Sequence, residues 1–383
     1  MITSLRLRNF KGIRRADIGL ERLTVIVGPN ASGKTSFLEG LHYLSRMGVV
    51  GPKKVFRGRS DPLLLYRRDA AGEEMELACS RPEGGIRLLI VPPGAIINEL
   101  PHPLQASDGW NFRFEGKEEG GTAGIWRAID EIPAVARMFR PAARLYLDVS
   151  CMSNPSESIG KRIGMNGNGL APVLAFMALN QPDDFQQIQQ RLKSVVPTLE
   201  RIRFDRASRD PSNAYHITIQ ELKKRFPKRY SGIDSSRTYA IVFDFRGARN
   251  IPAHLASEGT MLILGLLTAL MVRGRPNLVL LDDIERGLHP KAQREVVGLL
   301  RTILDQNPEL QIVATTHSPY LVDSLRPEEV RLTTLDEDGT VSCAGLVDHP
   351  DFDKWKDEMA PGEMWSLFGE KWVGDLQKDA GVK

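Results

Sequence analysis

The stretch "GPNASGKTS", residues 28–36, decides how the rest of the chain is interpreted. It matches the pattern G-x-x-x-x-G-K-[ST], which needs glycines at 28 and 33, Lys34, and a hydroxyl residue at 35. The apolar run 23–27 before it predicts a buried strand, and a helical apolar face follows over 33–47. A strand that enters a glycine-rich loop and opens a helix is the setting in which this pattern binds phosphates.

Within the loop, backbone N–H groups of residues 30–35 are expected to surround the phosphates of a nucleotide. Lys34 would reach the β and γ phosphates, and Thr35 would bind Mg²⁺. The residues that we expect to contact the nucleotide in this loop are Asn30, Ala31, Ser32, Gly33, Lys34, Thr35 and Ser36.

Two later segments predict further parts of the same site. "LVLLDDIERGLHP" (278–290) is an apolar strand that ends at Asp282, the type of residue that supplies the Mg²⁺ partner in P-loop ATPases. "IVATTHSP" (312–319) is a second apolar strand, and it leads to His317. Taken alone, this histidine is better interpreted as a capping or core residue. Strand ends in open α/β sheets meet at the ligand, however, so its position favours the site.

Together with these segments, three more motifs carry a family resemblance: "LRLRNFKGI" (5–13), "SEGT" (257–260) and "ERGLHP" (285–290). In this order the motifs resemble those of the ABC-type ATPases, in the branch that contains the RecF, SMC-like and OLD proteins. "SEGT" is similar to the signature motif of the family, "ERGLHP" to its D-loop, and His317 to its switch histidine. The resemblance covers residues 1–47 and 250–325 well, and the middle of the chain only through its helical pattern over 168–200.

The resemblance implies an α/β fold: an ABC-type P-loop ATPase head with a mixed β-sheet core and an inserted, mainly helical lobe. We expect the N-terminal half of the head in residues 1–95 and the inserted lobe in 96–250. The C-terminal half, with the signature, the acidic strand and the switch histidine, is expected in 251–346, and a tryptophan-rich tail in 347–383.

The resemblance also implies that two heads sandwich ATP. Ser257 and Gly259 of one head would then contact the γ-phosphate held by the other head, so the protein would form a homodimer or a higher homo-oligomer through ATP. Ser257 is also a good N-cap for a helix over 260–272. Both roles use the same helix end and are compatible.

The catalytic residues implied by the resemblance are Lys34, Asp283 and His317, and one of them departs from the family. Glutamate usually follows the Mg²⁺ aspartate and orients the attacking water, whereas this chain has Asp283. The shorter side chain predicts slow hydrolysis of ATP. The alternative is a nucleotide-gated scaffold or binding protein with negligible turnover. A third class, the energy subunit of a membrane transporter, is disfavoured because "SEGT" lacks the transporter signature.

Two segments outside the motifs suggest partners. The basic stretch "KKRFPKR" (223–229) could track a DNA backbone or be a solvated loop; its cations are Lys223, Lys224, Arg225, Lys228 and Arg229. The tail (351–373) carries three of the five tryptophans and either packs on its own head or docks a partner. No nuclease domain is expected after Ser318, so a separate effector protein would act on DNA. The settings that the resemblance implies are DNA repair and anti-phage defence.

Composition is consistent with these interpretations. The 383 residues carry a net charge of only +3, so binding to nucleic acid would depend on a local patch of charge. The three cysteines lie far apart in the sequence and favour a reducing compartment. The longest apolar run, 261–272, is too short to span a bilayer. We therefore expect a cytoplasmic protein that does not contact membranes.

Overall fold

In the computed structural model, the described residues are 1–50, 55–56, 61–70, 72–82, 84–92, 104–105, 111–118, 124–126, 142–157, 162–206, 238–337 and 339–381. The chain divides into two compact units. The first comprises Met1–Arg144, Pro276–Glu285 and Leu304–Lys383, and the second comprises Leu145–Arg275 and Arg286–Ile303. Each unit is built from segments that are far apart in the sequence.

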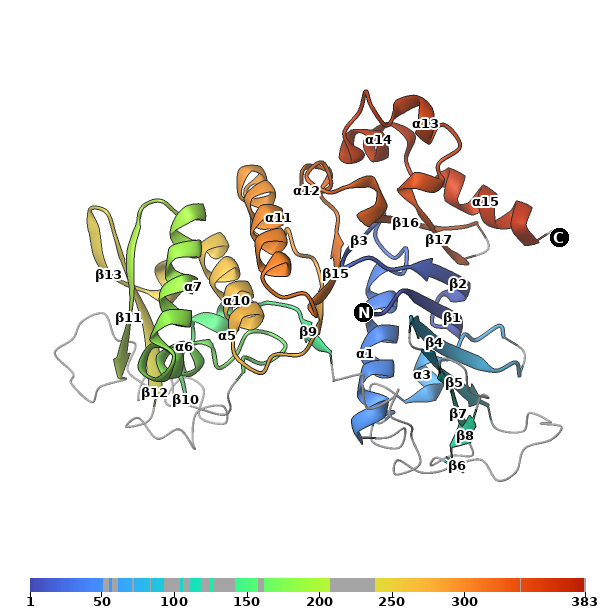
Figure 1. The fold of residues 1–383 in the computed structure, drawn as a ribbon, viewed down its shortest axis with the longest axis horizontal. Helices are drawn as coiled ribbons and strands as arrows, with labels where there is room; N and C mark the ends of the chain where they lie inside the picture. The colour runs from blue at the N-terminus through green and yellow to red at the C-terminus, as the bar shows by residue number, and fades with distance from the viewer. Residues whose placement is uncertain are drawn as a thin grey trace. The chain divides into compact units, whose positions relative to one another are not determined.

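An antiparallel sheet forms one part of the first unit (Figure 1). Its strands, in spatial order, are β2 (Ile13–Gly19), β1 (Ser4–Phe10), β4 (Met75–Arg81), β5 (Gly84–Val91), β7 (Asn111–Glu118) and β6 (Leu104–Gln105), with β8 (Gly124–Trp126) paired to β7. On β1, Leu5 and Leu7 are buried while Arg6 and Arg8 are exposed. This alternation is what a sheet with one solvated face requires.

Strand β7 extends further than the sequence suggests. Residues 115–124 are rich in Gly and Glu and look like a surface loop, yet β7 continues through 115–118. Pairing explains the difference, because these residues lie opposite Gly84–Arg87 of β5. Hydrogen bonds to a neighbouring strand outweigh weak local β-propensity.

A second, mixed sheet carries the predicted motifs. Its strands, in spatial order, are β17 (Val341–Gly345), β16 (Val330–Leu335), β3 (Leu23–Val27), β15 (Gln311–Thr316), β14 (Leu278–Leu281) and β9 (Ala143–Leu145). The neighbours β16, β3, β15 and β14 run parallel, and β17 is antiparallel to β16. Every residue of β3, β14 and β15 is buried, which fits the unbroken apolar runs of a parallel sheet.

Helix α1 (Lys34–Val50) contacts both sheets of the first unit, through β1 and β4 of one and β14 and β15 of the other. Its apolar stripe of Phe37, Leu38, Leu41 and Leu44 is almost completely buried. This stripe belongs to one continuous core with both sheets. The helix that begins at Lys34 is therefore fixed by packing from Phe37 to Leu44.

The C-terminal segment of the first unit packs on its own head. Strands β16 and β17 form an antiparallel hairpin, with Gly339 at φ 75° in the turn. Helix α15 (Lys371–Gly381) lies against both strands, and Trp365 is only 8% exposed. The remaining helices of this unit are α3 (Pro62–Leu65), α12 (Pro319–Val322), η6 (Pro327–Glu329), η7 (Leu346–Asp348), α13 (Phe352–Trp355) and α14 (Pro361–Phe368).

The second unit combines helices with a small sheet. Its helices are α5 (Val149–Ser153), α6 (Leu170–Asn180), α7 (Pro182–Val195), η5 (Ala253–Leu255), α10 (Glu258–Met271) and most of α11 (Pro290–Asp305). Its strands are β10 (Ser156–Glu157), β12 (Thr238–Phe245), β11 (Leu199–Arg206) and β13 (Ala248–Pro252). Helices α6 and α7 are separated at Pro182, as the sequence predicts.

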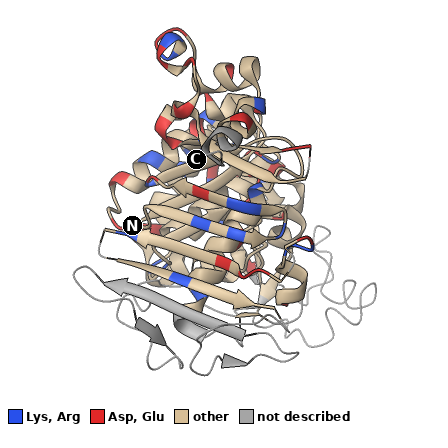
Figure 2. Cartoon of the chain, turned by 90° about the vertical axis from the view of Figure 1, so that its right-hand side faces the viewer, with Lys and Arg blue, Asp and Glu red and all other residues tan. Residues whose placement is uncertain are grey.

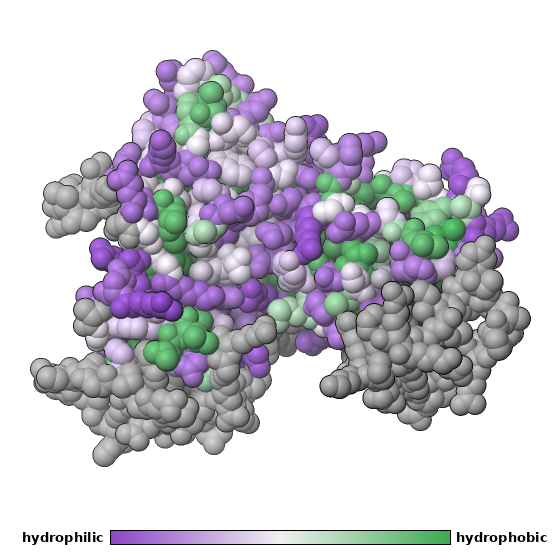
Figure 3. Space-filling view, turned by 180° about the vertical axis from the view of Figure 1, so that it is seen from behind, coloured by the Kyte–Doolittle hydropathy of each residue, from purple (hydrophilic) through white to green (hydrophobic). Residues whose placement is uncertain are grey.

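Helix α10 is buried on all sides in the second unit from Thr260 to Leu270. Hydrophobic side chains reach the molecular surface in patches on the face that Figure 3 shows. In the second unit, Phe176 and Leu179 of α6 are exposed. Within the described ranges, no helix is long and apolar enough to cross a membrane.

Gln311 at the start of β15 joins the N-terminus to the mixed sheet. Its side chain accepts a hydrogen bond from Ile2 N at 2.9 Å and donates to Ile2 O at 2.7 Å and to Glu21 O at 3.0 Å. Gln311→Leu leaves these backbone groups unpaired in a buried site, so we expect the free energy of unfolding to fall by about 2–4 kcal/mol in urea denaturation. The exposed Gln187→Leu on α7 is the matched control. Equal stability of both variants would contradict this role.

Candidate functional site

The loop 28–33 has a backbone that only its glycines permit. Gly28 has φ 146° and Gly33 has φ 86°. A Cβ atom at Gly28 would lie 2.2 Å from the carbonyl oxygen of Thr333, and one at Gly33 would lie 2.8 Å from Cγ1 of Val341. The hairpin β16–β17 therefore packs directly against the loop and requires both glycines.

Polar contacts also fix the loop. Ser32 is fully buried, and its hydroxyl lies 2.7 Å from that of Thr333, which donates to Val27 O at 3.0 Å. Asn30, Ala31 and Thr35 are exposed, while Gly33 and Ser36 are half-buried. Helix α1 begins at Lys34, and the first N–H groups of a helix have no partner within it. The loop thus presents backbone donors on a rigid frame, which fits an anion.

Lys34 places its ammonium group inside this loop. Nζ donates to Gly28 O at 2.9 Å and to Pro29 O at 2.7 Å, and the residue is only 5% exposed. Burial lowers the pKa of Lys34, and the nearby carboxylates Asp283, Glu285 and Asp282 oppose this shift. A largely desolvated cation held only by two carbonyls fits a strongly charged anionic ligand such as a triphosphate.

Asp282 gathers polar groups from three elements of the first unit. Its Oδ1 accepts from the hydroxyls of Thr35 at 3.2 Å and Thr315 at 2.8 Å, and its Oδ2 lies 3.4 Å from Nη2 of Arg144. The structure therefore brings Thr35 and Asp282 together, as predicted for a metal site. A hydroxyl and a carboxylate oxygen are ligands that Mg²⁺ prefers, so the donor set fits this ion.

Arg144 is a site residue that the sequence motifs do not reveal. Its guanidinium group bridges Asp282 and Glu39 of α1, with Nη1 3.1 Å from Glu39 Oε1. Lys11 also pairs with Glu39. The Arg144 side chain is only 15% exposed, so these interactions are poorly screened. No local pattern marks it, because its importance comes from the position of β9 in the sheet.

Asp283 follows β14 with a left-handed backbone, φ 51°. Its N–H donates to the hydroxyl of Thr315 at 2.9 Å, and its Oδ1 lies 3.8 Å from Nε2 of His317. Burial raises the pKa of Asp283, with Asp282 and Glu285 adding to the shift and His317 and Lys34 opposing it. Aspartate tolerates the left-handed conformation better than glutamate, which gives a local reason for this residue type here.

Glu285 is a second site residue whose role the sequence motifs do not reveal. Its carboxylate accepts from the Thr316 hydroxyl at 2.7 Å and from the backbone N–H of His317 at 2.8 Å. It therefore fixes the backbone from which His317 projects toward Asp283. Its place in the "ERGLHP" segment, three residues after Asp282, was the only sequence signal.

The signature residues 257–260 and the D-loop residues 286–290 lie in the second unit, whereas Glu285 belongs to the first. Ser257 caps α10, because its hydroxyl accepts from Thr260 N at 3.2 Å; the predicted cap is confirmed. Gly259 packs beside the backbone of Gly287, which has φ 67°. The role of Ser257 and Gly259 toward a nucleotide on another head stays a prediction.

The basic stretch 223–229 lies outside the described residues. Of the arginines that precede it in the sequence, Arg201 and Arg203 both bond to Asp244 of β12, at 2.7 Å and 3.0 Å. These two cations therefore contribute to the packing of β11 on β12.

Two relatives of known name are similar to this chain. One is the OLD nuclease of Thermus scotoductus, 25% identical over 361 residues, which cover 89% of this chain but 63% of the nuclease. The DNA replication and repair protein RecF of Chloroflexus aggregans is 49% identical over 73 residues, 19% of this chain and 17% of RecF. The chain thus spans less than two thirds of the length of either relative.

A solved structure shows the fold. The Smc head bound to the C-winged helix domain of ScpA has a TM-score of 0.51 at 16% identity, and the match covers 92% of this chain and 99% of that one. The predicted fold class, an ABC-type head with a mixed sheet, is confirmed. One family model, "AAA ATPase domain", matches residues 1–86, and another, "AAA domain, putative AbiEii toxin, Type IV TA system", matches residues 130–323. Because the second match covers just over half of the chain, the protein belongs to this family of AAA domains, with the fold of the RecF, SMC and OLD-type ATPases.

Proposed function

We propose that this chain binds ATP with Mg²⁺, hydrolyses it slowly, and uses an ATP-dependent association of heads to switch a DNA complex or a separate effector protein. The observation that carries the proposal is the meeting of Thr35 with Asp282 at 3.2 Å, beside a buried Lys34. Membership of an AAA domain family supports the ATPase activity in general, and the finer points below are proposals.

In this proposal the loop 30–36 binds the phosphates through backbone N–H groups, and Lys34 leaves its carbonyl partners to meet the β and γ phosphates. Thr35 and Asp282 hold the metal ion, which supplies positive charge to the phosphates when bound. Arg144 already lies on the opposite oxygen of Asp282 and holds that carboxylate in place.

Asp283 is the proposed acceptor of the proton from the attacking water. A raised pKa brings a carboxylate closer to the value at which it accepts a proton effectively. Its side chain is one methylene shorter than glutamate, so its reach toward the γ-phosphate is reduced and slow turnover follows. His317, 3.8 Å from Asp283, would orient this carboxylate and sense the γ-phosphate.

Ser257 and Gly259 are the proposed contacts with ATP held by a second head. Ser257 is exposed at the N-terminus of α10, a helix of 14 residues. The positive end of such a helix favours an anion, and the serine hydroxyl can donate to it. Each head would then complete the site of the other in a homodimer or a higher homo-oligomer.

The relatives suggest the settings in which such a switch would work. One is named a nuclease and another a DNA replication and repair protein, which supports DNA as part of the complex. DNA repair or anti-phage defence in the cytoplasm, with a separate effector protein, is the setting that we propose.

A nucleotide-gated scaffold with negligible turnover is the second candidate. Asp283 favours it, because the same shortened side chain that slows hydrolysis also prolongs the ATP-bound state. The two candidates share the nucleotide site and differ only in whether phosphate is released at a useful rate.

Association of heads is tested by measuring molecular mass by light scattering with and without ATP. Wild-type protein should gain mass with ATP. Lys34→Ala removes the phosphate ligand and Ser257→Arg places a bulky side chain at the signature, so both should stay at the mass of the ATP-free protein. The exposed Gln187→Leu is the control and should behave as wild type. If Lys34→Ala and Ser257→Arg still associate with ATP, the sandwich is refuted.

Turnover is tested by phosphate release at saturating ATP. Asp283→Asn should lower the rate by about 10²-fold or more while ATP still binds. In wild type the rate should rise as pH increases through the pKa of Asp283, because only the ionised carboxylate accepts a proton. Since that pKa is raised, this rise should lie at higher pH than for an exposed aspartate. If the wild type releases phosphate only at the background rate and Asp283→Glu raises that rate, the scaffold is favoured instead.

A further inference from the structure

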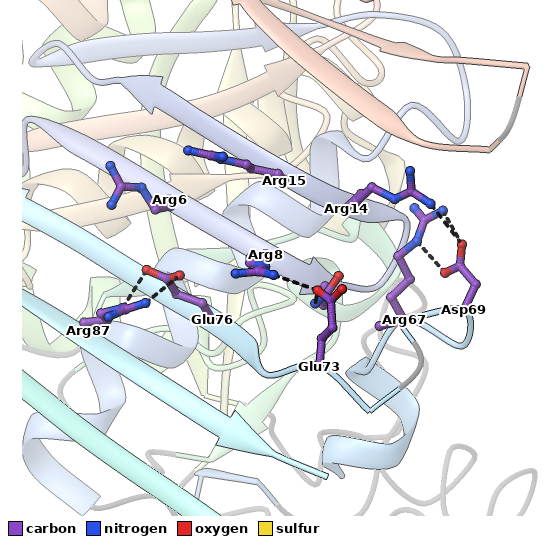
Figure 4. Close-up of a pocket in the computed structure, with 11 residues that line it drawn as sticks. Arg6, Arg8, Arg14, Arg15, Arg67, Asp69, Glu73, Glu76 and Arg87 are labelled. Carbon is purple, nitrogen blue, oxygen red and sulfur yellow. Dashed lines mark hydrogen bonds and ion pairs between the residues drawn. The ribbon is translucent and has the colours of Figure 1, made fainter. Parts of the chain in front are cut away.

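The solvent face of the antiparallel sheet carries five arginines, and a sixth, the buried Arg67, lies beside it. We call this group the arginine face: Arg6, Arg8, Arg14, Arg15, Arg67 and Arg87. They line an open hollow of about 600 Å³ built on β1, β2, β4, β5 and residues 67–70 and 73 (Figure 4). Figure 2 shows blue segments on neighbouring strands of this sheet. The face belongs to the first unit and is separate from the loop 28–36.

Strand register places the arginines in two rows across the sheet. Arg15 of β2 lies opposite Arg8 of β1, which in turn lies opposite Glu76 of β4. In the second row Arg6 lies opposite Ala78, and Ala78 lies opposite Arg87 of β5. Along β1, residues two apart are separated by about 7 Å. The small side chain of Ala78 leaves the space between Arg6 and Arg87 open.

The charge of the chain is concentrated here. The hollow is lined by six arginines and three carboxylates, Asp69, Glu73 and Glu76, and Asp17 pairs with Arg6 at its edge, which leaves a formal excess of two positive charges. The whole chain has a net charge of only +3, so most of this excess lies at the hollow. A local excess of this kind raises the concentration of polyanions near the surface.

Two of the arginines are held firmly, Arg67 by Asp69 at 2.5 Å and Arg87 by Glu76 at 2.8 Å.

The pairs made by the arginines of β1 are looser. Arg8 pairs with Glu73 at 2.7 Å and Arg6 with Asp17 at 2.6 Å, but all four side chains are 44–56% exposed. Exposed pairs of this type contribute little to stability and exchange readily. Among the described residues, Arg15 has no carboxylate within ion-pair distance, although Arg8 lies directly opposite. Like charges facing each other across strands are unfavourable unless an anion comes between them.

The chemistry of the lining residues indicates which anion fits. All the cations are arginines, whose planar guanidinium groups bind phosphate with two hydrogen bonds. None of the lining residues is aromatic, so the face offers no platform on which exposed bases could stack. Repeated phosphates on a base-paired duplex, whose bases are already stacked, match this surface better than a single strand.

We propose that the arginine face binds the phosphate backbone of duplex DNA. The role of this contact rests on the proposed function, in which DNA is part of the switched complex. Binding itself does not require ATP, since none of the lining residues belongs to the loop 28–36. Such contacts position a protein on a duplex without reading its sequence.

The test uses the full-length protein and the fluorescence anisotropy of a labelled 30-base-pair DNA duplex over a series of NaCl concentrations. Arg8→Ala/Arg15→Ala should weaken binding by about ten-fold or more and reduce the slope of log K against log salt by about 2. Arg8→Lys/Arg15→Lys should keep most of the slope. The control Arg246→Ala/Arg249→Ala removes the same charge from exposed positions of the second unit and should bind as wild type.

The outcomes separate this inference from the proposed function. Lys34→Ala should bind the duplex as wild type even though its ATP site is damaged. The melting temperature checks that Arg8→Ala/Arg15→Ala is folded. If this folded variant keeps the wild-type affinity for the duplex and the wild-type salt slope, the inference is overturned, while the proposed ATPase activity is unaffected. The inference would also be overturned if the protein bound a polyglutamate peptide or anionic vesicles but not the duplex. It would be overturned as well if duplex binding were lost only on substitution of residues 223–229.

Discussion

The carboxylate of Asp282 is the interaction on which the site depends. Its two oxygens meet Thr35 of α1, Thr315 of β15 and Arg144 of β9, three elements that are distant in the sequence. The side chain is only 6% exposed, and a carboxylate removed from water must be compensated by charge and hydrogen bonds. Placing Asp282 at the end of β14 therefore requires the phosphate loop on one side and β9 on the other. The order of strands in the mixed sheet meets this requirement.

Thr315 extends the same constraint to the next residue. Its hydroxyl donates to Asp282 and accepts from the N–H of Asp283, and its carbonyl accepts from Ile284 N at 3.1 Å. The chain after β14 is thereby turned into the left-handed conformation that favours aspartate at 283. Asp283 departs from the glutamate of the family pattern, yet aspartate suits the backbone conformation at this position. The short side chain and its backbone conformation are one feature, and both would set the rate of turnover in the proposed mechanism.

Much of this arrangement is predictable because it rests on local patterns. Buried strands read as unbroken apolar runs, and β14 and β15 begin and end where the sequence indicates. The loop follows from the spacing of Gly28, Gly33 and Lys34. Arg144 and Glu285 were not predicted, since their partners are set by which strands become neighbours. The same holds for the arginine face: Arg6 and Arg8 alternate with Leu5 and Leu7 in the sequence, but only the register brings Arg15 and Arg87 beside them.

Strand β1 connects the two functional surfaces of the first unit physically. Its inner face packs on α1 so closely that a Cβ atom at Gly40 would lie 2.7 Å from Cδ2 of Leu7, while its outer face carries Arg6 and Arg8. At the end of the strand, Lys11 pairs with Glu39, which Arg144 links to Asp282. A displacement of α1 when phosphates enter the loop cannot be absorbed by loose packing, because interiors of this density transmit strain. The ion-paired route from Asp282 to Lys11 and the packing of Leu7 on α1 therefore give the nucleotide site a direct mechanical path to the sheet that carries the arginine face.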